Sequence, residues 1–233
     1  MPHSSSVGSY RLGFVKICGI TNTADRDVAA QAGADYFGAL VDVGYSPRTL
    51  SLDQASALFE LPPIPGVALL FNADPGRVQA VVERLQPFAV ELLGHEPPEE
   101  VASLKSRLEC QVWKSLHVPA RGRGDIDLEV MSELAEEYED SGADVLVFDT
   151  IDSSNGPMKY GGIVGDWGMI RNLARERAIP RCLAGGLNPG NVVQALQTVR
   201  PNGIDICSGV ESAVGKKDPA KLAALFENLK AYR

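Results

Sequence analysis

Short apolar runs, rich in β-branched and aromatic residues, recur along this chain at intervals of roughly thirty residues, separated by helix-like or loop segments. Parallel strands that alternate with helices in this way are typical of an α/β fold, the single (β/α)8 TIM barrel. A doubly wound open sheet is the alternative, because the fifth and seventh runs are the weakest. The eight expected strands lie at 14–18, 36–41, 66–71, 88–92, 112–116, 145–149, 182–184 and 204–207.

Three expected helix starts fit this alternation of strands and helices. Asp-Pro at 74–75, Asn-Pro at 188–189 and Asp-Pro at 218–219 each place a capping side chain directly before a proline. The capping oxygen accepts hydrogen bonds from the first turn of a helix, and proline suits the first helical position. Each pair is therefore expected to open a helix.

The length of the chain indicates one domain. Its 233 residues are 45% hydrophobic, so they can bury one sizeable core, and a barrel over residues 14–233 needs no second domain. Residues 1–13 are rich in serine and lack an apolar core of signal-peptide length. We expect them to form a short disordered lead.

Charge and cysteine usage exclude several classes of protein. A net charge of −8 gives no field that would hold nucleic acid, and the chain has no apolar run long enough to span a membrane. The cysteines show neither paired nor metal-type spacing, so we expect reduced thiols in the cytoplasm and no metal site. The four cysteines are Cys18, Cys110, Cys182 and Cys207.

The first and sixth expected strands each end on a reactive side chain. Lys16 and Cys18 share one face of their strand, and Val147 and Asp149 share one face of theirs. If both faces turn inward, a thiol and a carboxylate meet at the barrel mouth, where they could act as general base and general acid. The alternatives are that Cys18 is a small buried apolar residue and that Asp149 caps the next turn.

Two late loops indicate phosphate recognition. Gly185 and Gly186 separate the seventh strand from a helix start, and Ser208 and Gly209 follow the eighth strand. Backbone N–H groups on these two neighbouring loops form the usual phosphate cradle of barrels. A Gly-Gly pair alone would indicate only a turn.

Several motifs occur in a fixed order over nearly the whole chain. They are Lys-Ile-Cys-Gly-Ile-Thr at 16–21, Gly-Ala-Asp at 33–35, Ser-Pro-Arg at 46–48, Phe-Asp-Thr at 148–150, Gly-Gly at 161–162 with Asp-Trp at 166–167, Ala-Gly-Gly-Leu-Asn-Pro at 184–189, Ser-Gly-Val-Glu at 208–211 and Gly-Lys-Lys-Asp at 215–218. Together they resemble the phosphoribosylanthranilate isomerase family. This resemblance implies a barrel that performs the Amadori rearrangement of N-(5′-phosphoribosyl)anthranilate in tryptophan biosynthesis, a branch of aromatic amino acid biosynthesis, without metal or organic cofactor.

The resemblance also implies roles for individual residues. Cys18 matches the general base of the family and Asp149 its general acid, while Arg48 matches the arginine on the anthranilate side. Lys16 could favour the Cys18 thiolate, or it could pair with Glu91 or Asp205 in the barrel floor. The residues expected to bind the phosphorylated sugar are Gly161, Gly162, Gly185, Gly186, Ser208 and Gly209.

The chain departs from the family pattern at positions where the substrate would be recognised. Leu93 stands at the usual histidine position, with His95 two residues on, and Cys207 replaces a common serine. The second loop is one residue longer, which affects the expected placement of Arg48, and the sixth loop is shorter. Three functions stay open: the isomerase itself, a paralogue acting on another phosphorylated aminoaldose, and a noncatalytic sugar-phosphate binding protein. The expected assembly is a monomer or a homodimer.

Overall fold

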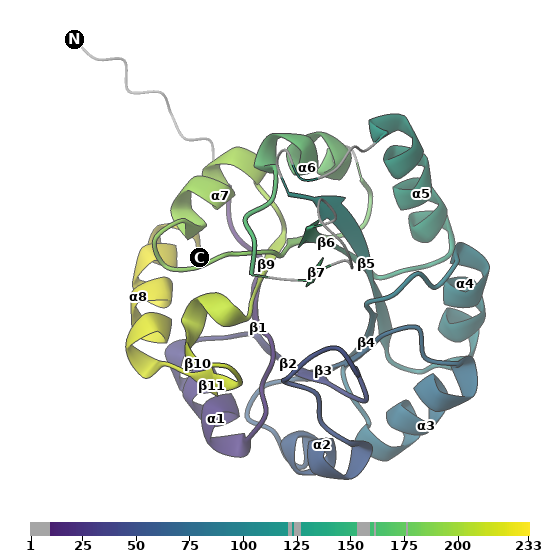
Figure 1. Cartoon of the computed structure of the whole chain (residues 1–233), viewed down its shortest axis with the longest axis horizontal. Helices are drawn as coiled ribbons and strands as arrows, with labels where there is room; N and C mark the ends of the chain where they lie inside the picture. Colours follow the sequence, from purple (N-terminus) through teal and green to yellow (C-terminus); the bar gives the residue numbers. More distant parts are fainter. Residues whose placement is uncertain (1–9, 121–122, 124–126, 153–158, 161, 176) are drawn as a thin grey trace.

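Eight parallel strands form a closed ring with helices outside it (Figure 1). The computed structural model describes residues 10–233 except 121–122, 124–126, 153–158, 161 and 176. The strands follow the order β5, β4, β3, β2, β1, β9, β8, β6, and β5 also pairs with β6. This last pairing closes the sheet, so the predicted TIM barrel is confirmed and the doubly wound open sheet is wrong.

The barrel strands lie close to their predicted positions. The strand from the weak fifth run extends to Pro119, because it pairs with β6 from Trp113 to Pro119. The eight strands are β1 Phe14–Ile17, β2 Tyr36–Leu40, β3 Gly66–Leu70, β4 Ala89–Leu92, β5 Gln111–Pro119, β6 Val145–Asp152, β8 Arg181–Leu183 and β9 Gly203–Ile206.

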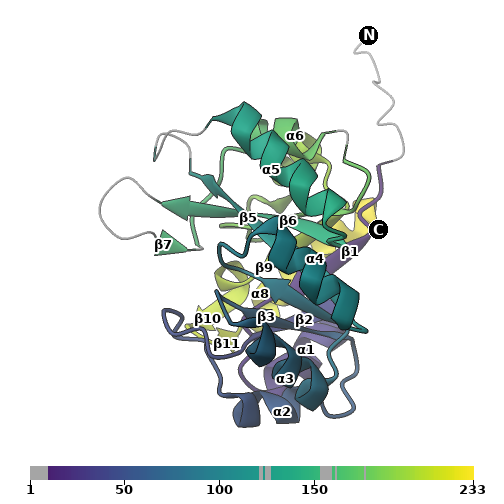
Figure 2. The same ribbon diagram turned by 90° about the vertical axis from the view of Figure 1, so that its right-hand side faces the viewer.

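Short additional strands lie on one side of the barrel. The two-residue β7 Lys159–Tyr160 pairs antiparallel with β6, and β10 Glu211–Ala213 forms a hairpin with β11 Lys216–Lys217. Figure 2 shows them on the side opposite the C-terminus, where the barrel strands end. The sequence pattern did not predict these three strands.

The helices surround the sheet as the repeat predicts. Asp74 and Asp218 cap their helices as expected, accepting hydrogen bonds from Arg77 N and from Ala220 N and Lys221 N. The prediction for Asn188 is wrong: its side chain closes a turn with Gly190 N, and the helix begins at Val192. The helices are α1 Thr23–Ala32, α2 Leu52–Phe59, α3 Pro75–Leu85, α4 Pro98–Arg107, α5 Leu128–Asp140, α6 Trp167–Ala174, α7 Val192–Val199, α8 Pro219–Leu229 and the 3-10 turns η1 Ser208–Val210 and η2 Lys230–Tyr232.

Alternation along each strand separates two buried cores. Val15 and Ile17 pack outward against the helices, whereas Cys18 belongs to the cluster inside the barrel. On β6, Leu146 packs outward and Val147 inward. The inward orientation that Cys18 and Asp149 require is therefore the observed one.

The packed chain begins earlier than the predicted boundary at residue 14. Leu12 is buried in the outer core, and its N–H donates a hydrogen bond to Tyr232 O at 2.7 Å. The Tyr10 hydroxyl donates to Pro201 O at 2.6 Å. The predicted disordered lead is wrong for residues 10–13, because an apolar side chain and backbone pairing hold them against the barrel. Residues 1–9 lie outside the described residues.

Candidate active site

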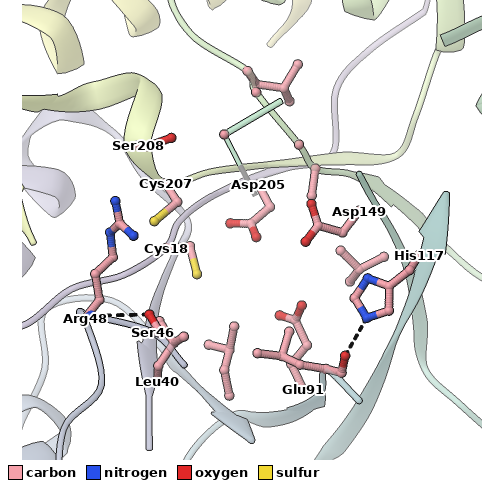
Figure 3. A pocket seen from close by; sticks show the side chains of 18 of the residues that line it. Cys18, Leu40, Ser46, Arg48, Glu91, His117, Asp149, Asp205, Cys207 and Ser208 are labelled. Atoms are coloured by element: carbon pink, nitrogen blue, oxygen red, sulfur yellow. Dashed lines mark hydrogen bonds between the residues drawn. The ribbon is translucent and has the colours of Figure 1, made fainter. Parts of the chain in front are cut away.

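A pocket opens at the carboxyl ends of the strands, where barrel enzymes carry their active sites (Figure 3). It brings together most of the predicted site residues. Gly209 lies beside the lining, and the predicted Gly161 lies outside the described residues. The lining includes Cys18, Arg48, Asp149, Gly162, Gly185, Gly186 and Ser208, as predicted, together with Tyr45, Ser46, Glu91, Leu93, His117, Asp205 and Cys207.

Asp149 points into this pocket from β6 (Figure 3). Its carboxylate accepts a hydrogen bond from Thr150 N at 2.8 Å. Burial disfavours the charged form and raises the pKa of Asp149 to about 6, which outweighs the hydrogen bond from the backbone. A carboxyl group that keeps its proton close to neutral pH is suited to donate that proton to a substrate.

Cys18 enters the same pocket from the end of β1 (Figure 3). Its N–H donates to Ile206 O at 2.9 Å, which continues the pairing with β9 and orients the thiol inward. Interaction with the Cys207 side chain, burial and the charge of Asp205 raise the pKa of Cys18 well above its ordinary value. The thiol form of Cys18 is therefore favoured in the resting site, and a base role requires a way to remove its proton.

Lys16 pairs with two carboxylates in the barrel floor. Its ammonium group contacts Glu91 and lies 3.2 Å from Asp205 Oδ2, and all three side chains are nearly or fully buried. The hydroxyl of Ser115 also donates to Glu91, at 2.9 Å. The structure thus supports the pairing role of Lys16 over that of a cation dedicated to Cys18, since a buried ammonium needs partners.

Asp205 presents one oxygen to the pocket. Burial raises the pKa of this carboxyl group although Lys16 opposes the shift. Its Oδ1 is buried and has no hydrogen-bond partner among the described residues. A buried acceptor of this kind is suited to a polar ligand atom, because leaving it unpaired costs free energy. Sequence reasoning had placed Asp205 in the floor only as a partner of Lys16.

Arg48 reaches the pocket despite the longer second loop. Its Nε donates to Glu211 Oε1 at 2.8 Å and its Nη2 to Glu211 Oε2 at 2.6 Å. Lys217 Nζ donates to the same carboxylate at 3.0 Å. Although burial opposes the shift, Arg48 and Lys217 lower the pKa of Glu211. The guanidinium is held in a fixed plane and retains other N–H groups that can bind a carboxylate.

Three loops converge on one side of the pocket. A Cβ on Gly186 would lie 2.6 Å from Val164 N, and a Cβ on Gly209 would lie 1.9 Å from Leu187 O. Gly162 likewise faces the Ser208 side chain, at 3.7 Å from a Cβ position to Oγ. At Gly186 and Gly209 only glycine permits these close approaches of backbone to backbone, which is how barrels build cradles for a phosphate group.

His117 is a pocket residue that sequence reasoning missed. Its Nε2 donates to Leu93 O at 2.6 Å, because a carbonyl oxygen can only accept. Burial lowers the pKa of His117 to about 4, so the ring is neutral at pH 7. The expected strand stopped at residue 116, one position too early. Alternation of Trp113, Ser115 and His117 on one face was the signal that could have found it.

Leu93 itself points into the barrel, whereas His95 lies at the rim. His95 is 6.0 Å from His117 between ring centroids and 6.3 Å from Phe71. Tyr45 contacts Phe71 edge to face at 4.9 Å. The change at Leu93 therefore leaves the pocket with an imidazole from the next strand, and with an aromatic rim on the side away from the glycine loops.

Fold and site together define a class of protein: a TIM-barrel enzyme whose acid, thiol and glycine-rich loops meet at the carboxyl ends of the strands. The described residues include no helix long and apolar enough to cross a membrane, and no cluster of three or more side chains that could hold a metal.

Comparison with known proteins identifies the family. A model of N-(5′-phosphoribosyl)anthranilate (PRA) isomerases matches residues 15–228. An isomerase of that name from Methanocella arvoryzae is 36% identical over 222 residues, which cover 94% of this chain and 99% of that protein. The Thermotoga maritima phosphoribosyl anthranilate isomerase structure superposes with a TM-score of 0.78 at 33% identity, covering 94% of this chain and all of that one. The chain belongs to the PRA isomerase family.

A further solved structure shows a member of this family with a ligand. It is a PRA isomerase in complex with reduced 1-(o-carboxyphenylamino)-1-deoxyribulose 5-phosphate, with a TM-score of 0.74 at 31% identity over 94% of this chain and the whole of that one. That ligand carries a phosphate group, a sugar chain and an aromatic carboxylate.

Proposed function

We propose that this protein catalyses the Amadori rearrangement of N-(5′-phosphoribosyl)anthranilate to 1-(o-carboxyphenylamino)-1-deoxyribulose 5-phosphate in tryptophan biosynthesis. The observation that carries the proposal is the meeting of Asp149 and Cys18 in one pocket beside the glycine loops. Membership of the PRA isomerase family supports the choice of substrate. The reaction oxidises C2 and reduces C1 of one molecule, so the enzyme is an intramolecular oxidoreductase of the aldose–ketose type.

The pocket suggests one orientation of the substrate. The phosphate lies against the backbone N–H groups of the glycine loops, around Gly186 and Ser208. The anthranilate lies toward Arg48, whose guanidinium binds its carboxylate. This arrangement places C1 and C2 of the ribose between the two catalytic groups, Asp149 and Cys18.

The chemistry then needs one acid and one base. Asp149 donates its proton to the ring oxygen, the C1–O bond breaks, and the nitrogen lone pair forms a C1=N iminium. The Cys18 thiolate removes the acidified proton from C2, and the electrons of that bond form C1=C2 while the iminium electrons return to nitrogen. Return of a proton from Cys18 to C1, and loss of the C2 hydroxyl proton to Asp149, gives the ketone and restores both groups.

The decisive experiment measures turnover of freshly generated N-(5′-phosphoribosyl)anthranilate by the loss of anthranilate-type fluorescence. We expect Cys18→Ser and Asp149→Asn each to lower kcat by about 100-fold or more, with smaller changes in ground-state binding. Folded wild-type protein that binds inorganic phosphate but does not turn over this substrate would overturn the proposal.

Leu93 at the usual histidine position favours one second candidate, a paralogue that rearranges another phosphorylated aminoaldose. Turnover of an anthranilate-bearing and a nonaromatic aminoaldose phosphate separates the two, since preference for the nonaromatic compound would reject the first. A noncatalytic sugar-phosphate binding protein would keep its ligand affinity and its biological role in Cys18→Ser and Asp149→Asn. We further expect a cytoplasmic monomer or homodimer, which fractionation and sedimentation would test.

A further inference from the structure

We propose that Cys207 is a positioning residue for the base: it shares one proton with Cys18 and takes that proton when Cys18 must act on C2. The idea rests on the proposed function, because it assigns Cys207 a task in that reaction. It goes further in naming where the negative charge of the thiol pair resides before substrate binds.

The two thiols occupy the ends of neighbouring strands. Ile17 of β1 pairs with Ile206 of β9, so Cys18 and Cys207 follow at matching positions. Both side chains line the pocket, and Figure 3 shows their sulfur atoms on the same side of it. Interaction with the other sulfur atom is the largest influence on the pKa of each thiol, raising that of Cys18 and lowering that of Cys207. In the proposal, a proton passes between the sulfur atoms of these two neighbouring strand ends.

The cations of the site gather around Cys207. Lys217 Nζ is buried and donates to Cys207 O at 3.1 Å. A Cβ on Gly19 would lie 2.7 Å from both Arg48 Cδ and Cys207 Sγ, so the arginine side chain passes beside this sulfur. The negative charge of Glu211 counteracts these cations, because its Oε1 lies 4.0 Å from Cys207 Sγ. Both Arg48 and Lys217 also pair with this same carboxylate.

The surroundings of Cys18 have the opposite balance. The charge of Asp205 raises the pKa of Cys18 and that of Lys16 lowers it, and Lys16 is already bound to Asp205 and Glu91. Interaction with Cys18, followed by the charges of Lys217 and Arg48, lowers the pKa of Cys207 against the effect of burial and Glu211. The pKa of Cys18 is raised. Together with the cations beside Cys207, these directions lead us to assign the resting pair as a Cys18 thiol beside a Cys207 thiolate.

This distribution supplies the base that the reaction needs. The Cys207 thiolate accepts the proton of Cys18, which leaves Cys18 as the thiolate. Cys18 then accepts the C2 proton, so both thiols are protonated while the enolamine exists. After Cys18 has delivered that proton to C1, its thiolate regains the proton held by Cys207, and the resting pair returns. A serine hydroxyl at position 207 could hydrogen-bond to Cys18 but could not hold this charge near neutral pH.

The first test locates the thiolate in the ligand-free protein by its ultraviolet absorbance near 240 nm as a function of pH. We expect wild type to show a thiolate that forms near neutral pH, Cys207→Ser to lose it, and Cys18→Ser to keep it. Cys110→Ser is the matched control, because Cys110 lies outside the pocket, at the opposite ends of the strands, and its pKa is raised by burial. Persistence of the signal in Cys207→Ser would overturn the proposal.

A second test uses the pH dependence of kcat/KM. We expect Cys207→Ser to shift the acidic limb upward by about one pH unit or more and to recover activity at high pH, where Cys18 ionises directly. A purely structural loss would lower the rate equally at every pH and would contradict the proposal. If wild type fails to turn over the substrate, the proposed function is wrong. The absorbance titration still tests the assignment of the thiolate to Cys207.

A third measurement needs no variant. Brief alkylation of wild type by iodoacetamide at pH 7, followed by peptide mapping, should label Cys207 before the other cysteines. First labelling of Cys18 would reverse the assignment and overturn the proposal.

Discussion

Arg48 and Glu211, 163 positions apart in the chain, form a two-pronged ion pair with distances of 2.8 and 2.6 Å. The pair links the loop after β2 to the β10–β11 hairpin, and Lys217 joins it from the hairpin side at 3.0 Å. Because both Arg48 nitrogens that bind Glu211 lie in one plane, the pair orients the guanidinium at the pocket wall.

Glu211→Gln should therefore weaken substrate binding more than chemistry. Glutamine keeps one acceptor oxygen but loses the charge and the second hydrogen bond, so the plane of Arg48 is no longer held. We expect KM for N-(5′-phosphoribosyl)anthranilate to rise about tenfold or more, since hydrogen bonds to charged groups are worth roughly 1.5–3 kcal/mol. Steady-state kinetics on the pH plateau would measure this. Asp42→Asn is the control, because it breaks the exposed pair with Arg77 and should change little.

Asp149→Asn should stabilise the fold, with a dependence on pH. The native pKa of Asp149, about 6, exceeds the value near 3.9 of an unfolded chain, so the native state retains a proton that the unfolded state releases between these values. The stability contributed by this proton is complete below about pH 4 and is lost as the pH rises through 6. Above that pH the buried carboxylate costs up to about 3 kcal/mol.

Urea denaturation at pH 5 and pH 8 would check this expectation. The gain in unfolding free energy from Asp149→Asn should be larger at pH 8 than at pH 5. An equal gain at both values would mean that the carboxyl group does not titrate in this range. The hydrogen bond from Thr150 N can remain, because asparagine offers the same acceptor.

Lys16→Met should destabilise the barrel floor. Methionine fills a similar volume but leaves Glu91 and Asp205 buried without their shared cation. Breaking a buried ion pair by removing one partner costs about 3–5 kcal/mol. Urea denaturation measures the loss, and Lys16→Met with Glu91→Gln should recover part of it. Failure of the second substitution to restore any stability would argue against unpaired charge as the cause.

Gly186→Ala should damage phosphate binding while the fold is retained. Gly186 has φ of +63°, and a Cβ there would lie 2.6 Å from Ile163 C and Val164 N. The added methyl group must push apart two of the three converging loops, so we expect the inhibition constant of inorganic phosphate to rise about tenfold or more. Gly44→Ala offers a matched control, since its Cβ would meet nothing within 4 Å. An equal change in the inhibition constant of inorganic phosphate for both variants would contradict phosphate binding by the glycine loops.

Much of the site followed from local pattern. Alternation along β1 and β6 predicted which residues share a strand face with Cys18 and with Asp149, and the structure turns both faces inward and places both side chains in the pocket. His117 escaped detection because the pattern of its strand weakened at residue 116, whereas the pairing of β5 with β6 continues to Pro119. Asn188 was misplaced because a capping residue before proline also suits a turn.

The sequence by itself determined the approximate positions of the eight strands, the residues that share a strand face and the motifs that mark the family, because strand periodicity and turn chemistry act between residues close in the chain. Only the tertiary structure decided which distant groups share charge: that Lys16 is bound to Glu91 and Asp205, that Arg48 is held by Glu211, and that Arg48 and Lys217 lie beside Cys207. Electrostatic interactions and desolvation act through space, so they depend on which strand ends the closed barrel brings together.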